Sequence, residues 1–176
     1  MKRILLSALM GAACAQAAWA GDVKVSWGKM DDFTDIQASY EHKQVFREHL
    51  TQEFEAVFAG LAKKLPEGFT LEVNVKDIDL AGEVKPMVGA WNGMVRVMKP
   101  IHWPRLSFEY KLSNAQAEQI ASGKEELRDM DYLQRIRMPS GNTSFEFEER
   151  MLQEWFRHQL LSGAFPARDT PAIATK

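Results

Sequence analysis

Cysteine is almost absent from this sequence of 176 residues. Its single cysteine, Cys14, lies in the first twenty residues, which have the pattern of a segment that is removed on export. The chain that remains has no thiol, so it can form no disulfide, use no cysteine nucleophile and build no thiolate metal site. Such a chain must take its stability from an apolar core.

The first twenty residues, MKRILLSALMGAACAQAAWA, predict a secretory signal peptide. Lys2 and Arg3 are basic, a short apolar run follows, and Ala18-Trp19-Ala20 has small residues where a signal peptidase cleaves. The run is too short for a membrane anchor. We therefore expect a periplasmic mature chain that begins at Gly21. Lipid attachment at Cys14 is the less favoured alternative, because the usual leucine three residues before the cysteine is missing.

Long hydrophobic runs and excess positive charge are also missing. No run of eighteen apolar residues follows the signal segment, so we expect no transmembrane segment in the mature chain. Without Lys2 and Arg3, 20 basic residues stand against 24 acidic ones. This balance offers no basic surface for nucleic acid, and we expect none as a partner. We assign residues 21–162 to a single domain and residues 163–176 to a flexible C-terminal tail.

Two stretches have the periodicity of amphipathic helices. Between residues 40 and 65, apolar residues recur at spacings of three and four until Pro66 and Gly68 end the pattern. A second stripe lies between residues 143 and 161, where Thr143 and Glu146 match a capping box. The expected core residues are Phe46, Leu50, Phe54, Val57, Phe58, Leu61 and Leu65 in the first helix, and Met151, Leu152, Trp155, Phe156 and Gln159 in the second.

Alternating apolar and polar residues predict strands at 23–27, 71–75, 95–97 and 105–112. The stretch 114–127 has a helical composition, but Gly123 would interrupt a helix, so we favour a strand that pairs with 105–112. The order β-α-β-β-β-β-α predicts an α+β fold. We expect a mostly antiparallel sheet of about five strands with both helices packed on one face.

The segment VKDIDLAGEVKP, residues 75–86, is rich in carboxylates. Its apolar positions are odd up to Val75 and even from Ile78, so we expect a bulge near residues 76–77. Asp77 and Asp79 would then accept hydrogen bonds from the turn that follows. Two alternatives remain open: a metal or ligand site with Glu83, whose spacing does not match a calcium loop, and a catalytic pair of carboxylates.

Histidine and methionine do not predict a metal site. His42 and His49 are seven residues apart on the first helix, about 10 Å in rise, and we expect both on its exposed surface. Met94, Met98 and His102 are spaced by four, which would suit copper on a helix. The valines around them predict an extended chain, where four residues span about 13 Å. We therefore expect no metal and no cofactor.

The segment His102-Trp103-Pro104-Arg105 is the strongest candidate for a contact surface. Alternation along the following strand places Trp103 and Arg105 on the outward face of the sheet. An outward tryptophan beside an arginine suits stacking or contact with an anion or a protein partner. The alternative is that a helix or loop covers Trp103. The polar loop at 129–142 is the next candidate.

Four segments are distinctive in combination: DIDLAG at 77–82, RVMKPIHWPRLSFEY at 96–110, LRDM at 127–130, and ERML at 149–152 with Trp155-Phe156. Taken in this order, they resemble a bacterial family of small exported proteins known as domain of unknown function 3016. The resemblance covers nearly the whole mature chain and implies no established activity, substrate or catalytic residue. It supports a hairpin at 105–128, although residues 114–117 lack the Asp-Gly turn typical of the family.

Two functional hypotheses follow. The favoured one is a non-catalytic binding module of the cell envelope, which contacts an unknown envelope protein or ligand through Trp103, Arg105, Asp77 and Asp79. The alternative is a hydrolase of an envelope component that uses Asp77 or Asp79 with a histidine from elsewhere. A cleft in which carboxylates with raised pKa values converge would favour the hydrolase. A flat sheet face with exposed aromatic residues would favour the binding module.

Overall fold

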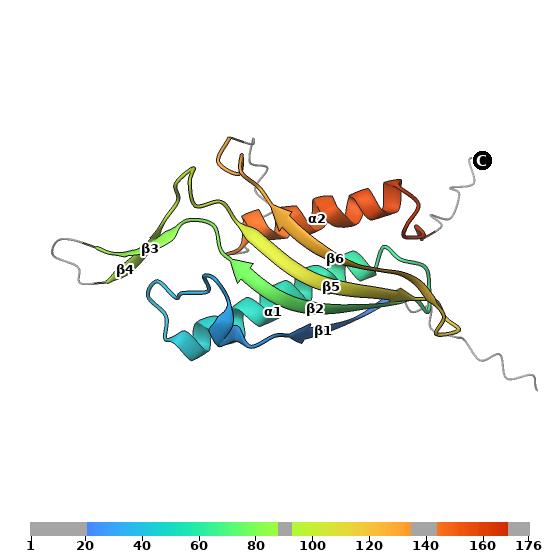
Figure 1. Cartoon of the computed structure of the whole chain (residues 1–176). Helices are drawn as coiled ribbons and strands as arrows, with labels where there is room; N and C mark the ends of the chain where they lie inside the picture. The colour runs from blue at the N-terminus through green and yellow to red at the C-terminus, as the bar shows by residue number, and fades with distance from the viewer. Residues whose placement is uncertain (1–20, 88–92, 135–143, 169–176) are drawn as a thin grey trace, which may run out of the picture.

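The computed structural model describes residues 21–87, 93–134 and 144–168. The expected signal peptide, Thr143 of the expected capping box and most of the 129–142 loop lie outside these ranges. Figure 1 shows a curved sheet with two helices on one face and a two-stranded ribbon projecting from one end. The α+β fold predicted from the sequence is confirmed.

The main sheet has four strands in the order β1-β2-β5-β6. Strand β1 pairs in parallel with β2, and the other neighbours are antiparallel. A parallel pair needs a crossover connection, and helix α1 supplies it between β1 and β2. The bounds are β1 Asp22–Trp27, α1 Lys43–Ala62, β2 Thr70–Asp79, β5 Arg105–Ser113, β6 Gln119–Arg128 and α2 Glu146–Leu161. A short 3-10 helix, Met30–Asp32, follows β1.

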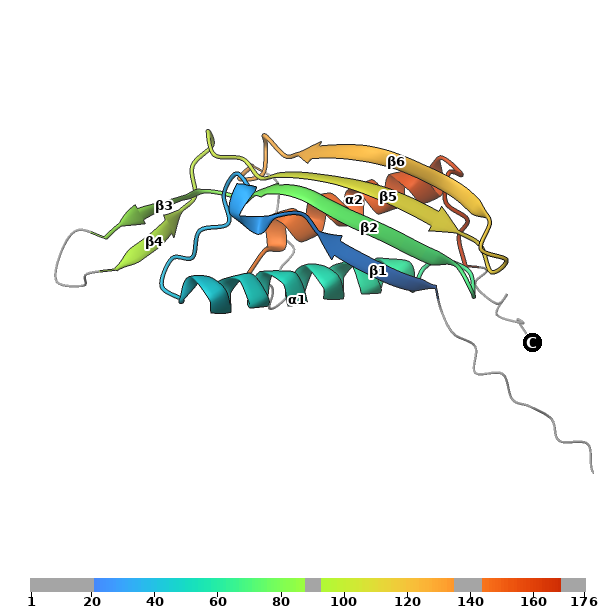
Figure 2. The same cartoon turned by 60° about the horizontal axis from the view of Figure 1, so that its bottom comes forward.

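Both helices lie on the same face of the sheet (Figure 2), as predicted. The core fills the space between the helices and the sheet. In α1 the predicted stripe is buried at Leu50, Phe54, Phe58 and Leu61. Helix α2 buries its own stripe at Met151, Leu152, Trp155 and Phe156. Phe46, Val57 and Gln159 lie half-buried at the margins.

The projecting ribbon was not predicted as a separate unit. Strand β4 (Met94–Val97) matches the expected strand at 95–97, but it pairs with β3 (Glu83–Pro86) and does not join the main sheet. The described residues therefore form six strands, compared with about five expected. Strand β3 escaped prediction because it is only four residues long, with one aliphatic residue and a proline.

The bulge predicted at the end of the 71–75 strand is confirmed. Strand β2 continues to Asp79, and its pairing with β5 shifts register between Val75 and Asp77. Val75 and Ile78 are both fully buried on either side of the shift. One extra residue thus moves the apolar positions from odd to even without breaking the strand.

The ambiguous stretch after residue 114 forms strand β6, as favoured. Gly123 pairs with Tyr110 across the hairpin, and a Cβ atom at Gly123 would lie 2.9 Å from the tyrosine ring. The glycine therefore leaves room for the ring and does not mark a break. In place of an Asp-Gly turn, the side chain of Asn114 accepts hydrogen bonds from the N–H groups of Gln116 and Glu118.

Residues 163–168, which we assigned to a flexible tail, pack in part against the core. Phe165 is buried and makes ring contacts with Tyr110 and Trp155 at centroid distances of 5.5 and 5.7 Å. The N–H of Arg168 donates to the carbonyl oxygen of Lys64. The chain is therefore packed as far as residue 168, because Phe165 completes the aromatic part of the core.

Candidate binding pocket

The outward face of the sheet carries charged side chains that pair across the strands. Lys24 lies 3.7 Å from Glu72, and Glu109 lies between Lys76 and Lys124 at 3.1 and 2.8 Å. Neither helix covers this face (Figure 2). Its chemistry is that of a solvated ion-pair network, where each exposed pair stabilises the fold by only about 0–1 kcal/mol.

Asp77 and Asp79 each bind a neighbouring segment. The carboxylate of Asp77 accepts hydrogen bonds from the backbone N–H and the hydroxyl of Thr34, both at 2.6 Å. Asp79 accepts from Nε of Arg105 at 2.8 Å. Among the described residues, these partners stand in place of the expected bonds to the turn after β2.

Trp103 and Arg105 do not share a face. Strand β5 begins only at Arg105, so the alternation that we applied to Trp103 does not reach it. Trp103 is half-buried against a small apolar cluster of Ala81, Tyr132 and Phe147. The alternative that another segment covers Trp103 therefore holds in part.

Arg105 and Asp77 do come together, at the wall of an open depression on the outward face. Its other lining residues include Thr34, Ser107 and Arg128. Arg128 lies directly opposite Arg105 in the β5–β6 ladder. Two of the four candidate residues, Asp77 and Arg105, thus line one depression. Asp79 does not line it but accepts a hydrogen bond from Arg105, and Trp103 lies elsewhere.

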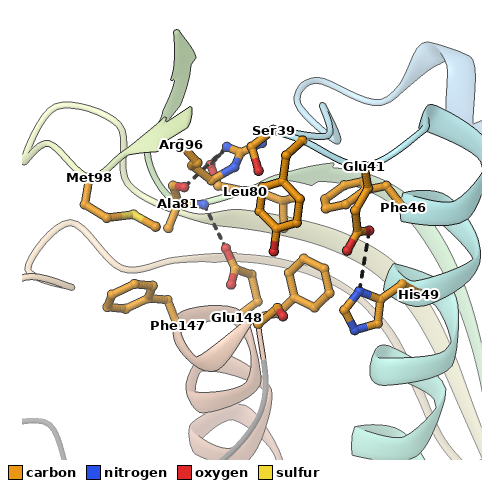
Figure 3. A pocket seen from close by; sticks show the side chains of 13 residues that line it. Ser39, Glu41, Phe46, His49, Leu80, Ala81, Arg96, Met98, Phe147 and Glu148 are labelled. Atoms are coloured by element: carbon orange, nitrogen blue, oxygen red, sulfur yellow. Dashed lines mark hydrogen bonds and ion pairs between the residues drawn. The ribbon is translucent and has the colours of Figure 1, made fainter. Parts of the chain in front are cut away.

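A more enclosed cavity of about 190 Å³ lies on the helix side, where the ribbon leaves the main sheet. Figure 3 shows Glu148 rising from α2 toward Ala81, with His49 and Phe46 approaching from α1 and Met98 from the segment after β4. The sequence predicted none of these residues as part of a site. The cavity is lined by Ser39, Tyr40, Glu41, Phe46, His49, Leu80, Ala81, Arg96, Met98, Ser144, Phe145, Phe147 and Glu148.

Glu148 lies in the first turn of α2 and is only 2% exposed. Its Oε1 accepts a hydrogen bond of 2.8 Å from the backbone N–H of Ala81. Burial raises the pKa of Glu148, and the backbone hydrogen bonds to its carboxylate oppose this rise only in part. A signal for this residue exists in the sequence, since Glu148 precedes Met151, Leu152 and Trp155 by three, four and seven and so falls on the apolar stripe.

Arg96 spans the side of the cavity next to the ribbon. Its Nη1 and Nη2 atoms lie 2.9 and 3.3 Å from the carboxylate of Asp35, and Nη2 also donates to the carbonyl oxygen of Gln37 at 2.9 Å. Nη1 reaches the carbonyl oxygen of Ala81 at 3.3 Å as well. The terminal donors of Arg96 are therefore engaged in joining the 35–37 loop to the turn after β2.

We expected His49 on the exposed surface of α1, but its side chain faces the cavity. Its Nδ1 lies 3.8 Å from Oε2 of Glu41, its Nε2 lies 3.6 Å from Glu53, and its ring lies 5.8 Å from that of Phe145. Oε2 of Glu41 is buried and has no hydrogen-bond partner within the described ranges. His42 instead caps α1, accepting from the N–H of Gln44.

The segments that carry the family resemblance meet in space. Asp79 of the 77–82 segment binds Arg105 of the 96–110 segment, and Glu148, next to the 149–152 segment, accepts a hydrogen bond from the N–H of Ala81. Arg150 lies 3.1 Å from the buried Asp129, which joins the 149–152 and 127–130 segments. These polar contacts hold the end of the sheet at which the cavity lies.

The described residues show neither a metal-binding cluster nor a membrane-spanning helix. Across residues 21–87, 93–134 and 144–168, no group of three or more His, Cys, Asp or Glu side chains is arranged to hold a metal ion. Within these ranges, no helix combines the length and apolar character needed to cross a bilayer.

Comparison with known proteins gives a family and little more. A family model described as "Protein of unknown function (DUF3016)" matches residues 21–158. No curated protein matches the sequence. Among solved structures, the 2.35 Å crystal structure of a minor lipoprotein from Acinetobacter baumannii is similar over 84% of this chain and 98% of that chain. The identity is 8% and the TM-score is 0.25, which is too low to establish a shared fold.

Proposed function

The chain belongs to the DUF3016 family, whose function is unknown, and from its own geometry we propose that it is a non-catalytic binding protein of the cell envelope. Its binding site, in this proposal, is the partly closed cavity between α1, α2 and the base of the ribbon. The observation that carries the proposal is a partly closed cavity with aromatic walls and a few convergent polar groups, which is the usual construction of a ligand site.

The size of the cavity limits what it can hold. At about 190 Å³ it is larger than an apolar cavity of roughly 150 Å³ that admits benzene, and smaller than the roughly 300 Å³ at which sites for drug-sized ligands begin. It therefore suits a ligand about as large as one ring, or one side chain of a partner protein.

The alternative, a hydrolase that uses Asp77 or Asp79, has less support. Thr34 and Arg105 engage these carboxylates on the outward side of the sheet. His49, in contrast, belongs to α1 and faces the cavity on the helix side. A carboxylate and a histidine that act together must lie within hydrogen-bond reach of one substrate, and these groups are separated by the sheet.

Export to the periplasm is part of the proposal, and the signal-like first twenty residues support it. The family match begins at residue 21, the expected first residue of the mature chain. We expect the exported protein to have the intact mass of a chain that starts at Gly21. A diacylated species that starts at Cys14 would contradict this and would place the protein on a membrane.

A fragment screen against the mature protein tests the cavity as the binding site. We expect bound fragments to shift the backbone amide signals of residues 80–81 and 144–148 in two-dimensional NMR spectra. Met98→Trp should fill the cavity and weaken binding at least about tenfold, since it removes the space that the ligand occupies. Met87→Trp is the matched control, because Met87 is similarly exposed (45%, against 40% for Met98) but does not line the cavity.

Two results would contradict the cavity as the binding site. One is unchanged affinity in Met98→Trp, and the other is a set of shifted signals confined to the outward depression. The second result would support the surface that the sequence suggested, with Asp77 and Arg105 as contacts. That surface is the second candidate, because Arg128 lies beside Arg105 there and makes no ion pair with any described residue.

A further inference from the structure

The charged groups that line the cavity are two carboxyl groups and one guanidinium group. Glu148 and Glu41 both present carboxyl groups to it. Arg96, the permanently charged cation of the lining, has its Nη1 and Nη2 atoms occupied by Asp35 and by backbone carbonyl oxygens. Besides uncharged hydroxyl groups, which can donate or accept, a ligand therefore meets two carboxyl groups and a guanidinium that is already engaged.

The charge around the cavity favours the same kind of ligand. Arg96 and Asp35 form an ion pair and leave no net charge between them. Glu41 and Glu53 flank His49 on the α1 side. An anion would be repelled by these carboxylates at short range, whereas a cation would be attracted.

The Glu41 carboxylate is the group best placed for this role. Its Oε2 atom is buried and lacks a hydrogen-bond partner within the described ranges, with the imidazole of His49 nearest at 3.8 Å. Removing a charged oxygen from water without a donor is costly. A cationic ligand group beside this carboxyl group would offset that cost by its charge.

The apolar walls of the cavity also suit a cation. Phe46 and Phe145 pack edge to face with their centroids 5.9 Å apart, and both line the cavity. Aromatic ring faces attract ammonium groups through their quadrupole, most strongly in desolvated sites. Met98 adds a flexible, polarisable wall against which a short alkyl group can pack.

We propose that the cavity binds an alkylammonium group on a short apolar body, with Glu41 as its main charged contact. This inference rests on the proposed binding function and names the ligand class. Such a group occurs in free amines, on lysine side chains of proteins and in lipid headgroups, and the cavity recognises their shared chemistry.

The test uses three probes of similar size in NMR titrations of the mature protein. Choline carries a quaternary ammonium, as some lipid headgroups do, and n-butylammonium has the charge and reach of a lysine side chain. The neutral alcohol 3,3-dimethylbutan-1-ol has the shape of choline without its charge. We expect at least one cation to shift the signals of residues 80–81 and 144–148. It should bind about tenfold more tightly than the alcohol, since cation–π and charge contacts together contribute about that much. The tighter cation then distinguishes the two sources.

A substitution of Glu41 separates charge recognition from simple filling of the cavity. Glu41→Gln should lower the affinity for the tighter cation about tenfold and leave the affinity for the alcohol unchanged. Glu48→Gln is the matched control, because it removes a carboxylate from α1 that does not line the cavity. Binding of both cations no tighter than that of the neutral alcohol would overturn the ligand class while the cavity itself stands. Binding of neither cation would also overturn it, and the fragment screen with Met98→Trp judges the binding function separately.

Discussion

Phe54→Ala is expected to lower the free energy of unfolding by about 3–5 kcal/mol, the range typical of a large-to-small change at a buried aromatic residue. Phe54 is 2% exposed and lies near the middle of α1. Its ring contacts Trp27 of β1 at 6.2 Å and Phe145 before α2 at 5.8 Å, edge to face and tilted respectively. The substitution therefore leaves a cavity where the sheet and both helical segments meet.

Urea denaturation followed by circular dichroism measures this effect. The control is Val45→Ala, also on α1, because Val45 is 55% exposed and should change stability by no more than about 0.5 kcal/mol. A Phe54→Ala protein with an unchanged midpoint and slope would show that Phe54 is not part of the core. With a single cysteine in the sequence, no disulfide within the chain constrains the unfolded state of either protein.

The core around Phe54 could be predicted because its signals are local. Helix periodicity is set by residues three and four apart, and strand alternation by residues two apart, so short windows of sequence contain both. The register shift after Val75 was visible for the same reason. Phe165 was missed because a single aromatic residue between glycine, alanine and proline has no periodicity to reveal its burial.

The cavity could not be predicted because its contacts join residues that are distant in sequence. Arg96 and Asp35 are 61 residues apart, and Glu148 and Ala81 are 67 apart. Alternation of Arg96 with Val95 and Val97 indicates an outward side chain. It does not show that the face of the ribbon that carries Arg96 packs against the 35–37 loop. The outward placement predicted for Trp103 does not hold for a related reason. Alternation applies only inside a strand, and β5 starts two residues later.

Replacing Glu148 in two ways should separate its hydrogen bond from its charge. Glu148→Ala removes the acceptor and leaves the N–H of Ala81 buried and unsatisfied. Glu148→Gln keeps a carbonyl oxygen at the same place. We expect the alanine variant to be less stable than the glutamine variant by about 1–3 kcal/mol at every pH, which is the usual effect of an unsatisfied buried donor. Thermal unfolding across a pH series measures the difference.

The difference in stability between the wild type and Glu148→Gln should depend on pH, and the direction of this dependence follows from the raised pKa of Glu148. Burial raises the pKa of Glu148, so the folded state holds the proton more tightly than the unfolded chain does. Stability must then rise as the pH falls through the folded-state pKa, until the unfolded chain is also protonated below its own pKa of about 4.5. The glutamine of Glu148→Gln does not titrate and stays neutral. The variant should therefore be more stable than the wild type, and by the largest margin at neutral and higher pH.

The stability gap between Glu148→Gln and the wild type should close toward pH 4.5, because both then carry a neutral group at position 148. A gap that is the same at pH 8 and pH 5 would show that Glu148 does not titrate abnormally and that burial is offset by its partners. A wild type more stable than the glutamine variant at neutral pH would mean that the carboxylate is preferred as a charge. The nearest cation able to cause this is Arg96, which lowers the pKa of Glu148 in opposition to burial. Adding Arg96→Met to both proteins would then abolish the wild-type advantage, because the charge that favoured the carboxylate is gone.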